Sequence, residues 1–143
     1  MSAWSFVAGK AARALAIVKN RFRRGGAGHL RLGAFGEDLA VSELVLGGYR
    51  VLERNTRIYG REVDVIAEEA GALVFIEVKT RSDHSFGKPL EAVDSRRRAR
   101  LRKAAELYVL KNHVKNVSIR FDVVTVDFTG GGSPEIEIVK NAF

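Results

Sequence analysis

The sequence predicts an α/β fold in which a mixed central sheet of about five strands is flanked by helices. Segments with helical spacing and segments with strand-like spacing of apolar residues follow one another in the order helix, three strands, helix, two strands. The 143 residues are enough to bury one core, and no internal repeat divides them. We therefore expect a single α/β sandwich domain over residues 29–143.

Each element is assigned from its local pattern. The first helix is predicted from near Glu37 to residue 46, where Gly47 and Gly48 end it. A second helix is predicted from Ser95, with Asp94 as its N-cap. Its buried face is expected to contain Leu101, Ala104, Ala105 and Tyr108. The strands are expected at 49–52, 61–66, 73–79, 119–126 and 135–138, the last of them at a sheet edge.

The second and third strands are predicted to form a hairpin whose loop centres on Ala70 and Gly71. Residues whose numbers sum to 141 are then paired, which places Asp64 opposite Glu77. Opposed side chains share a face and lie roughly 5 Å apart. Lys79 shares the face of Glu77 because a strand alternates with period two. Two carboxylates that repel as bare anions can share one divalent cation.

This group of two acids and one amine suits the hydrolysis of a phosphodiester. Mg²⁺ prefers carboxylate oxygens and keeps several waters, so Asp64 and Glu77 could hold it and leave room for a phosphate oxygen and a nucleophile. Lys79 could orient the attacking water or offset charge that grows on the phosphate. The alternative is that the three side chains form the solvated, salt-bridged end of an ordinary antiparallel sheet.

Six motifs include and surround these residues. In order they are Gly33-x-x-Gly36-Glu37, Asn55-x-Arg57, Glu62-Val63-Asp64-Val65-Ile66, Val74-Phe75-Ile76-Glu77-Val78-Lys79-Thr80-Arg81-Ser82, Phe86-Gly87-x-Pro89 and Arg120-Phe121-Asp122-Val123-Val124. In these motifs the chain resembles the YraN-like family of small bacterial proteins, which is similar to restriction-endonuclease-fold nucleases of the PD-(D/E)xK type. The resemblance covers roughly residues 30 to 126.

The resemblance implies a restriction-endonuclease-like α/β sandwich with Asp64 and Glu77 as the central metal-binding acids and Lys79 as the catalytic lysine. It also implies that Glu37 is a further metal ligand, because an acid on the first helix approaches the metal in many nucleases of this fold. Alternatively, Glu37 only stabilises a helix N-terminus, where the dipole favours acids. Since junction resolvases of this fold dimerise, the resemblance also makes a homodimer one expected form.

The net charge of +7 belongs entirely to the N-terminal part of the chain. Residues 1–36 hold seven Lys or Arg and no acid, whereas residues 37–143 hold seventeen of each sign. Residues 1–28 are expected to form a flexible or helical basic extension. This extension could be an electrostatic arm for nucleic acid, an amphipathic segment on an anionic membrane surface, or a segment without a role. We favour the arm.

A basic cluster lies at the start of the predicted second helix and includes Arg102. Cations near a helix N-terminus oppose its dipole, so a phosphate backbone nearby would compensate them. The alternative is a solvated face paired to Glu91 and Asp94. The residues that we expect to contact nucleic acid are Arg81, Arg96, Arg97, Arg98, Arg100 and Lys103.

Several classes of protein are poor candidates. The absence of cysteine excludes a disulfide framework and a thiolate metal site, and His29, His84 and His113 are scattered, which favours ordinary surface roles. No apolar run is long enough to span a bilayer, and Lys10 and Arg13 interrupt the segment that could resemble a secretory signal. We expect a cytoplasmic protein with no stable membrane insertion.

The leading hypothesis is a nuclease that depends on Mg²⁺ or Mn²⁺ and hydrolyses phosphodiester bonds in DNA. A small neutral domain leaves little surface for reading a long sequence, so recognition of DNA structure or ends is expected. The alternative is a non-catalytic module of the same fold that binds nucleic acid or a protein complex. A third hypothesis, a membrane-associated adaptor, depends only on residues 1–28.

Overall fold

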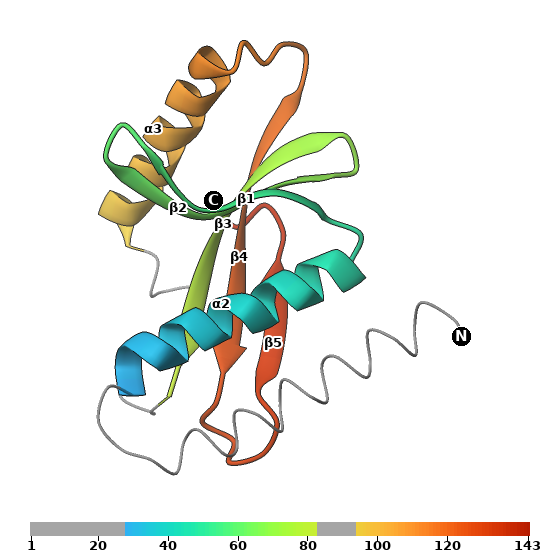
Figure 1. Ribbon diagram of the computed structural model, residues 1–143. Coiled ribbons are helices and arrows are strands. Elements are labelled where there is room, and N and C mark those ends of the chain that lie inside the picture. The colour runs from blue at the N-terminus through green and yellow to red at the C-terminus, as the bar shows by residue number, and fades with distance from the viewer. Residues whose placement is uncertain (1–27, 83–93) are drawn as a thin grey trace.

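The computed structural model describes residues 28–82 and 94–143, which form a five-stranded mixed sheet with a helix on each face (Figure 1). The elements are α2 (Gly28–Leu46), β1 (Arg50–Ile58), β2 (Arg61–Glu69), β3 (Ala72–Arg81), α3 (Ser95–Lys111), β4 (Ser118–Asp127) and β5 (Glu135–Val139). The strands lie side by side in chain order, and β3 pairs with β4 in parallel while the other neighbours are antiparallel. The predicted α/β fold is confirmed.

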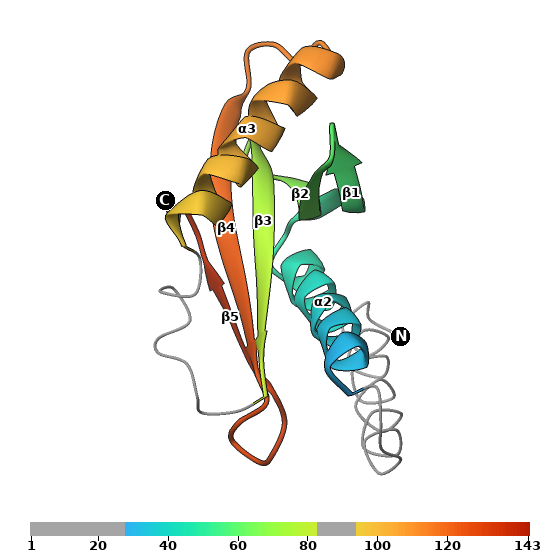
Figure 2. The same cartoon turned by 90° about the vertical axis from the view of Figure 1, so that its left-hand side faces the viewer.

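Strand β3 lies at the centre of the sheet and is covered on both faces (Figure 2). Val74 and Ile76 belong to the apolar cluster under α2, whereas Leu73 and Phe75 belong to the cluster under α3. A strand that is buried on both faces has a continuous apolar sequence instead of an alternating one. This explains the unbroken run that precedes Glu77.

The hairpin of β2 and β3 has the predicted loop and register. Ala70 and Gly71 form the turn with φ values of 50° and 77°, which is the left-handed region that two-residue hairpin turns require. The pairs run from Glu69 and Ala72 to Val65 and Ile76, and each pair sums to 141. The hairpin therefore brings Asp64 and Glu77 to neighbouring strands just beyond the last pair.

Helix α3 begins with the predicted cap. The carboxylate of Asp94 accepts a hydrogen bond from the backbone N–H of Arg97 at 2.8 Å, which satisfies a donor that has no partner inside the helix. The residues that α3 buries against the sheet are the predicted Leu101, Ala104, Ala105 and Tyr108. Arg96, Arg100 and Lys103 are exposed, whereas Arg97 reaches Glu77 of the sheet.

Helix α2 corrects one prediction. It begins at Gly28, so Glu37 lies in its middle, and its first turn contains no acid. The dipole-based alternative for Glu37 is therefore wrong. The glycines inside the helix made its N-terminal half difficult to recognise from propensity, but Gly36 is needed there because α2 crosses close to Thr80 of β3.

Some expectations concern residues that are not described. The basic extension up to residue 27, His84, Glu91 and the motif around Pro89 lie outside the described ranges. Between residues 28 and 82 and between 94 and 143, no helix has the length and apolar character needed to cross a membrane.

Candidate active site

Asp64 lies at a break in the regular alternation of β2. Val63 packs on the α3 face and Val65 packs on the α2 face, although residues two apart share a face in a regular strand. The pairing of β2 with β3 ends at Val65 and Ile76, and the backbone N–H of Val78 donates instead to Asp64 Oδ2 at 2.8 Å. The Asp64 carboxylate therefore lies where β2 and β3 separate.

Glu77 is a buried acid on the α3 face of β3, and its side chain is only 3% exposed. Its Oε1 atom lies 3.0 Å from Lys79 Nζ and forms a second ion pair with the guanidinium of Arg97. Neither contact has hydrogen-bond geometry, so Glu77 Oε1 is buried without a hydrogen bond from any described residue. An oxygen in this state can accept a stronger ligand, such as a cation.

The two carboxylates interact electrostatically. Burial and, to a smaller extent, the negative charge of Glu77 raise the pKa of Asp64 to about 7. The hydrogen bond from Val78 and the positive charge of Arg97 act in the opposite direction, while Glu37 adds to the increase. Asp64 therefore needs a positive charge nearby to remain ionised at neutral pH.

This donor set fits a hard divalent cation. Asp64 and Glu77 supply carboxylate oxygens, and Mg²⁺ is usually held in proteins by one or two carboxylates together with several waters. Within residues 28–82 and 94–143, no three Asp, Glu or His side chains converge to form a more complete metal site. Glu37 is close enough for its charge to affect Asp64, and its role as a third ligand stays a prediction.

The exposed cations of α3 form a surface beside this pair of acids. Arg97 is the one whose guanidinium reaches the site. The Arg98 guanidinium lies 5.4 Å from the centre of the Phe143 ring. The exposed members of the surface, which we call the α3 cationic surface, are Arg96, Arg97, Arg100, Arg102 and Lys103.

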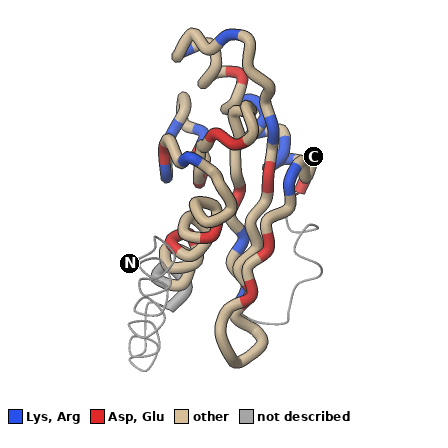
Figure 3. Tube along the Cα trace, turned by 90° about the vertical axis from the view of Figure 1, so that its right-hand side faces the viewer, with Lys and Arg blue, Asp and Glu red and all other residues tan. Residues whose placement is uncertain are grey.

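Two of the predicted nucleic-acid contacts are paired elsewhere. Arg81 Nη1 lies 4.0 Å from Asp127 Oδ2, and Lys103 Nζ lies 2.8 Å from Glu106 Oε2. Acidic and basic positions are interspersed over the described trace (Figure 3). The predicted cations are thus not all gathered at the carboxylates, and Arg97 makes the closest connection.

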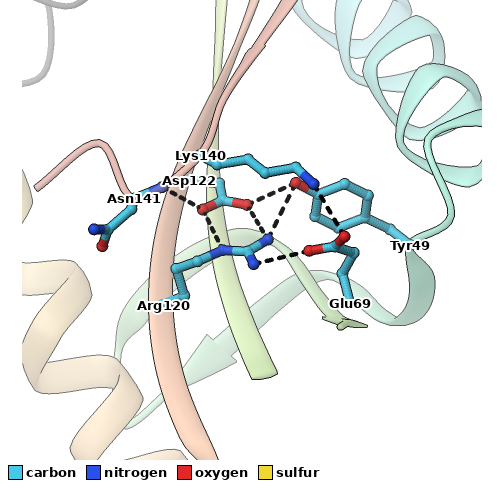
Figure 4. A network of polar contacts seen from close by, with 6 residues as sticks. All are labelled: Tyr49, Glu69, Arg120, Asp122, Lys140 and Asn141. Atoms are coloured by element: carbon cyan, nitrogen blue, oxygen red, sulfur yellow. Dashed lines mark hydrogen bonds and ion pairs between the residues drawn. The ribbon is translucent and has the colours of Figure 1, made fainter. Parts of the chain in front are cut away.

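A second polar cluster was missed by the sequence analysis (Figure 4). Asp122 is fully buried in β4, and its carboxylate accepts from Arg120 Nε at 2.9 Å, from Tyr49 Oη at 2.8 Å and from the backbone N–H of Asn141 at 2.9 Å. Arg120 also lies 2.8 Å from Glu69. The signal was two opposite charges, two residues apart, in an otherwise apolar strand.

This cluster is structural in character. Burial and the Asp122 carboxylate raise the pKa of Tyr49, so its hydroxyl remains a donor at physiological pH. The hydrogen bond from Lys140 and the guanidinium of Arg120 beside it lower the pKa of Glu69, which remains an anion. The cluster joins the start of β1, the end of β2, β4 and the segment after β5, and it is separate from Asp64.

Comparisons with known proteins identify relatives of this chain. A model of the uncharacterised protein family UPF0102 matches residues 36–126. A UPF0102 protein of Trichlorobacter lovleyi is 41% identical over 119 residues, which cover 82% of this chain and 94% of the relative. One of Pelobacter propionicus is 43% identical over 113 residues, covering 78% and 81%, and one of Clostridium botulinum is 40% identical over 114 residues, covering 78% and 93%. The family match includes Glu37, Asp64, Glu77 and Lys79.

Proposed function

We propose that this chain, which belongs to the uncharacterised family UPF0102, is a nuclease that hydrolyses phosphodiester bonds in DNA with Mg²⁺ or Mn²⁺. UPF0102 is the YraN-like family, and its fold is restriction-endonuclease-like. Fold alone does not support an activity. The observation that carries the proposal is the meeting of two buried acids, Asp64 and Glu77, with Lys79 Nζ 3.0 Å from one of them.

Each residue has a distinct role in the proposed reaction. Asp64 and Glu77 bind the divalent cation through their carboxylate oxygens. When bound, the cation would polarise the phosphodiester and lower the pKa of a water molecule. The ammonium of Lys79 orients that water or offsets the charge on the phosphate oxygens. Glu37 is the candidate for an additional ligand.

The α3 cationic surface is proposed to bind the phosphate backbone. Arginines at the first turns of a helix can contact successive phosphates and position DNA without reading its bases. This supports recognition of ends, branches or single strands with little sequence specificity. The same proposal includes a cytoplasmic location and, on branched DNA, a homodimer whose two sites could cut two strands.

A cleavage assay tests this function. The full-length protein and its Asp64→Asn and Lys79→Gln variants are incubated with branched, single-stranded and duplex DNA in Mg²⁺ or Mn²⁺. We expect cation-dependent cleavage that falls by about 100-fold or more in both variants, the size typical for loss of a group that stabilises the transition state. Asn at position 64 can still accept the hydrogen bond from Val78, so folding is preserved.

Two exposed residues provide matched controls. Glu62→Gln removes a carboxylate from the same strand as Asp64, and Lys111→Gln removes an ammonium at the end of α3. Both should retain cleavage close to that of the unaltered protein. Cleavage that persists in Asp64→Asn would contradict the proposal, and DNA binding without cleavage by any of the proteins would favour the non-catalytic module.

A further inference from the structure

Arg97 connects the α3 cationic surface to the pair of acids. Its backbone N–H is held by the Asp94 carboxylate at the helix N-terminus, while its guanidinium makes the ion pair with Glu77. The Arg97 side chain is 48% exposed, whereas that of Glu77 is 3% exposed. One side of this ion pair is therefore buried, and the other side is open to water.

Arg97 supplies positive charge to the same buried acid that a divalent cation would bind. Arg97 and Lys79 both supply positive charge to Glu77 Oε1, the buried oxygen that receives no hydrogen bond from a described residue, and Arg97 is the more exposed of the two. A buried carboxylate is costly unless it is compensated. A metal ion bound to the same oxygen would replace the compensation that Arg97 supplies and leave the guanidinium without Glu77 as its partner.

The first turn of α3 favours an anion as the new partner of that guanidinium. It contains Arg96, Arg97 and Arg98 and no acid, and the helix dipole opposes cations at this end. A phosphate bound beside the Asp94 cap would pair with the exposed guanidinium groups of Arg96 and Arg97. Arg97 thus has Glu77 on one side and the expected location of a DNA phosphate on the other.

We propose that Arg97 is a metal-loading switch: without DNA its guanidinium occupies the cation position beside Glu77, and a DNA phosphate at the first turn of α3 draws it away and opens that position. This inference rests on the proposed function and adds regulation to the same site. Metal and DNA then bind with positive coupling, and the coupling is reciprocal because it is a difference in binding free energy. The protein would therefore bind its metal more tightly on nucleic acid than when free.

The effect of Arg97→Gln on Mn²⁺ affinity tests the switch, because the switch predicts tighter binding. Mn²⁺ binding to the full-length protein is measured by calorimetry, without DNA, for the unaltered protein, Arg97→Gln and the control Lys111→Gln. If Arg97 competes with the metal, Arg97→Gln binds Mn²⁺ more tightly, by about fivefold or more, within the range of common coupling energies. Lys111→Gln should bind Mn²⁺ with unchanged affinity, and Arg97→Lys should restore part of the competition.

The second measurement adds DNA that resists cleavage. A single-stranded oligonucleotide with a phosphorothioate backbone should increase the Mn²⁺ affinity of the unaltered protein, and this increase should largely disappear in Arg97→Gln. A purely structural role of Arg97 predicts the opposite sign in the first measurement, because loss of a residue that only orients Glu77 weakens metal binding.

The possible outcomes distinguish failure of the switch from failure of the proposed nuclease function. If Mn²⁺ binding requires Asp64 but its affinity is unchanged or weakened in Arg97→Gln, the switch is wrong. The proposed metal site is then still supported. If neither the unaltered protein nor Arg97→Gln binds Mn²⁺ with or without DNA, both the switch and the proposed nuclease are wrong. Circular dichroism checks that each variant is folded. Arg97→Gln is expected to fold because it keeps the backbone N–H that donates to the Asp94 carboxylate.

Discussion

Asp64 is the residue whose ionisation is most affected by the fold. Its carboxylate is buried, it lies near the charge of Glu77, and one backbone N–H is its hydrogen-bond donor. Burial and the neighbouring acid together raise its pKa from an ordinary value of 3.8 to about 7. In the metal-free protein, Asp64 therefore carries a proton over part of the physiological pH range.

This shift predicts how stability depends on pH. Because the pKa of Asp64 is higher in the folded state than in the unfolded chain, the folded state binds the proton more tightly. The resulting stabilisation is complete below about pH 4 and is lost as the pH rises through about 7. The free energy of unfolding, measured in urea at several pH values, should show a loss of roughly 2–4 kcal/mol that Asp64→Asn does not share.

The same ionisation predicts competition between protons and metal. Mg²⁺ binds the ionised carboxylate, so its affinity should fall as the pH is lowered below about 7, and binding at pH 6 should release protons. Calorimetry in two buffers of different ionisation enthalpy measures the number released. Equal Mg²⁺ affinity at pH 6 and pH 8 would contradict this prediction.

At the scale of the elements, the approach of α2 to β3 determines where Glu37 lies. A Cβ atom added to Gly36 would overlap the Thr80 hydroxyl and lie 3.0 Å from Thr80 Cγ2 and 3.1 Å from Thr80 Cβ. Only glycine permits this crossing. The glycine therefore holds the helix against the strand that carries Glu77 and Lys79, and keeps Glu37 near Asp64.

Gly36→Ala should separate α2 from β3. We expect the free energy of unfolding to fall by about 1–3 kcal/mol, the usual cost of overpacking, and Mn²⁺ affinity to weaken as Glu37 moves. The matched control is Gly33→Ala in the same helix, where an added Cβ meets nothing within 4 Å. It should stabilise the protein by about 0.5–1 kcal/mol because alanine favours helices. Adding Thr80→Ala to Gly36→Ala should recover part of the loss, and its failure to do so would contradict the steric explanation.

The hairpin turn is a second element with a local consequence. Ala70 adopts a φ of 50°, a conformation that alanine disfavours and asparagine tolerates. Ala70→Asn should raise the free energy of unfolding by about 0.5 kcal/mol, seen as a higher urea midpoint with an unchanged slope. Ala70→Val should lower it instead, because β-branched residues are poorly accommodated at positive φ.

At the scale of the whole molecule, the acids have separate tasks in two places. The cluster around Asp122 ties together segments that are far apart in the sequence, from Tyr49 to Asn141. Glu77 Oε1, at the separation of β2 and β3, lacks a hydrogen bond from described residues, and so does Glu69 Oε2 at the margin of the cluster. Asp122 itself is satisfied by donors from Arg120, Tyr49 and Asn141, as expected of a buried carboxylate that stabilises a fold.

This division predicts different effects of removing a carboxylate. Asp122→Ala removes the acceptor shared by Arg120, Tyr49 and the Asn141 N–H and leaves Arg120 with Glu69 as its remaining acidic partner, so it should cost about 3–5 kcal/mol of unfolding free energy. The Mn²⁺ affinity of the fraction that remains folded should be unchanged. Glu137→Ala, on an exposed position of edge strand β5, is the control and should change the unfolding free energy by less than about 0.5 kcal/mol. Similar losses in both variants would contradict a special role for the cluster.

The sequence by itself determined the order of the elements, the register of the β2–β3 hairpin, the Asp94 cap and the buried face of α3, because each depends on residues close together in the chain. That register was enough to bring Asp64 and Glu77 to adjacent strands. Tertiary structure decided the rest: the helical state of the segment before Glu37, the reach of Asp64 to Val78, the ion pair of Arg97 with Glu77, and the cluster around Asp122. These features depend on how strands separate and helices cross, and such contacts join segments that no local pattern relates.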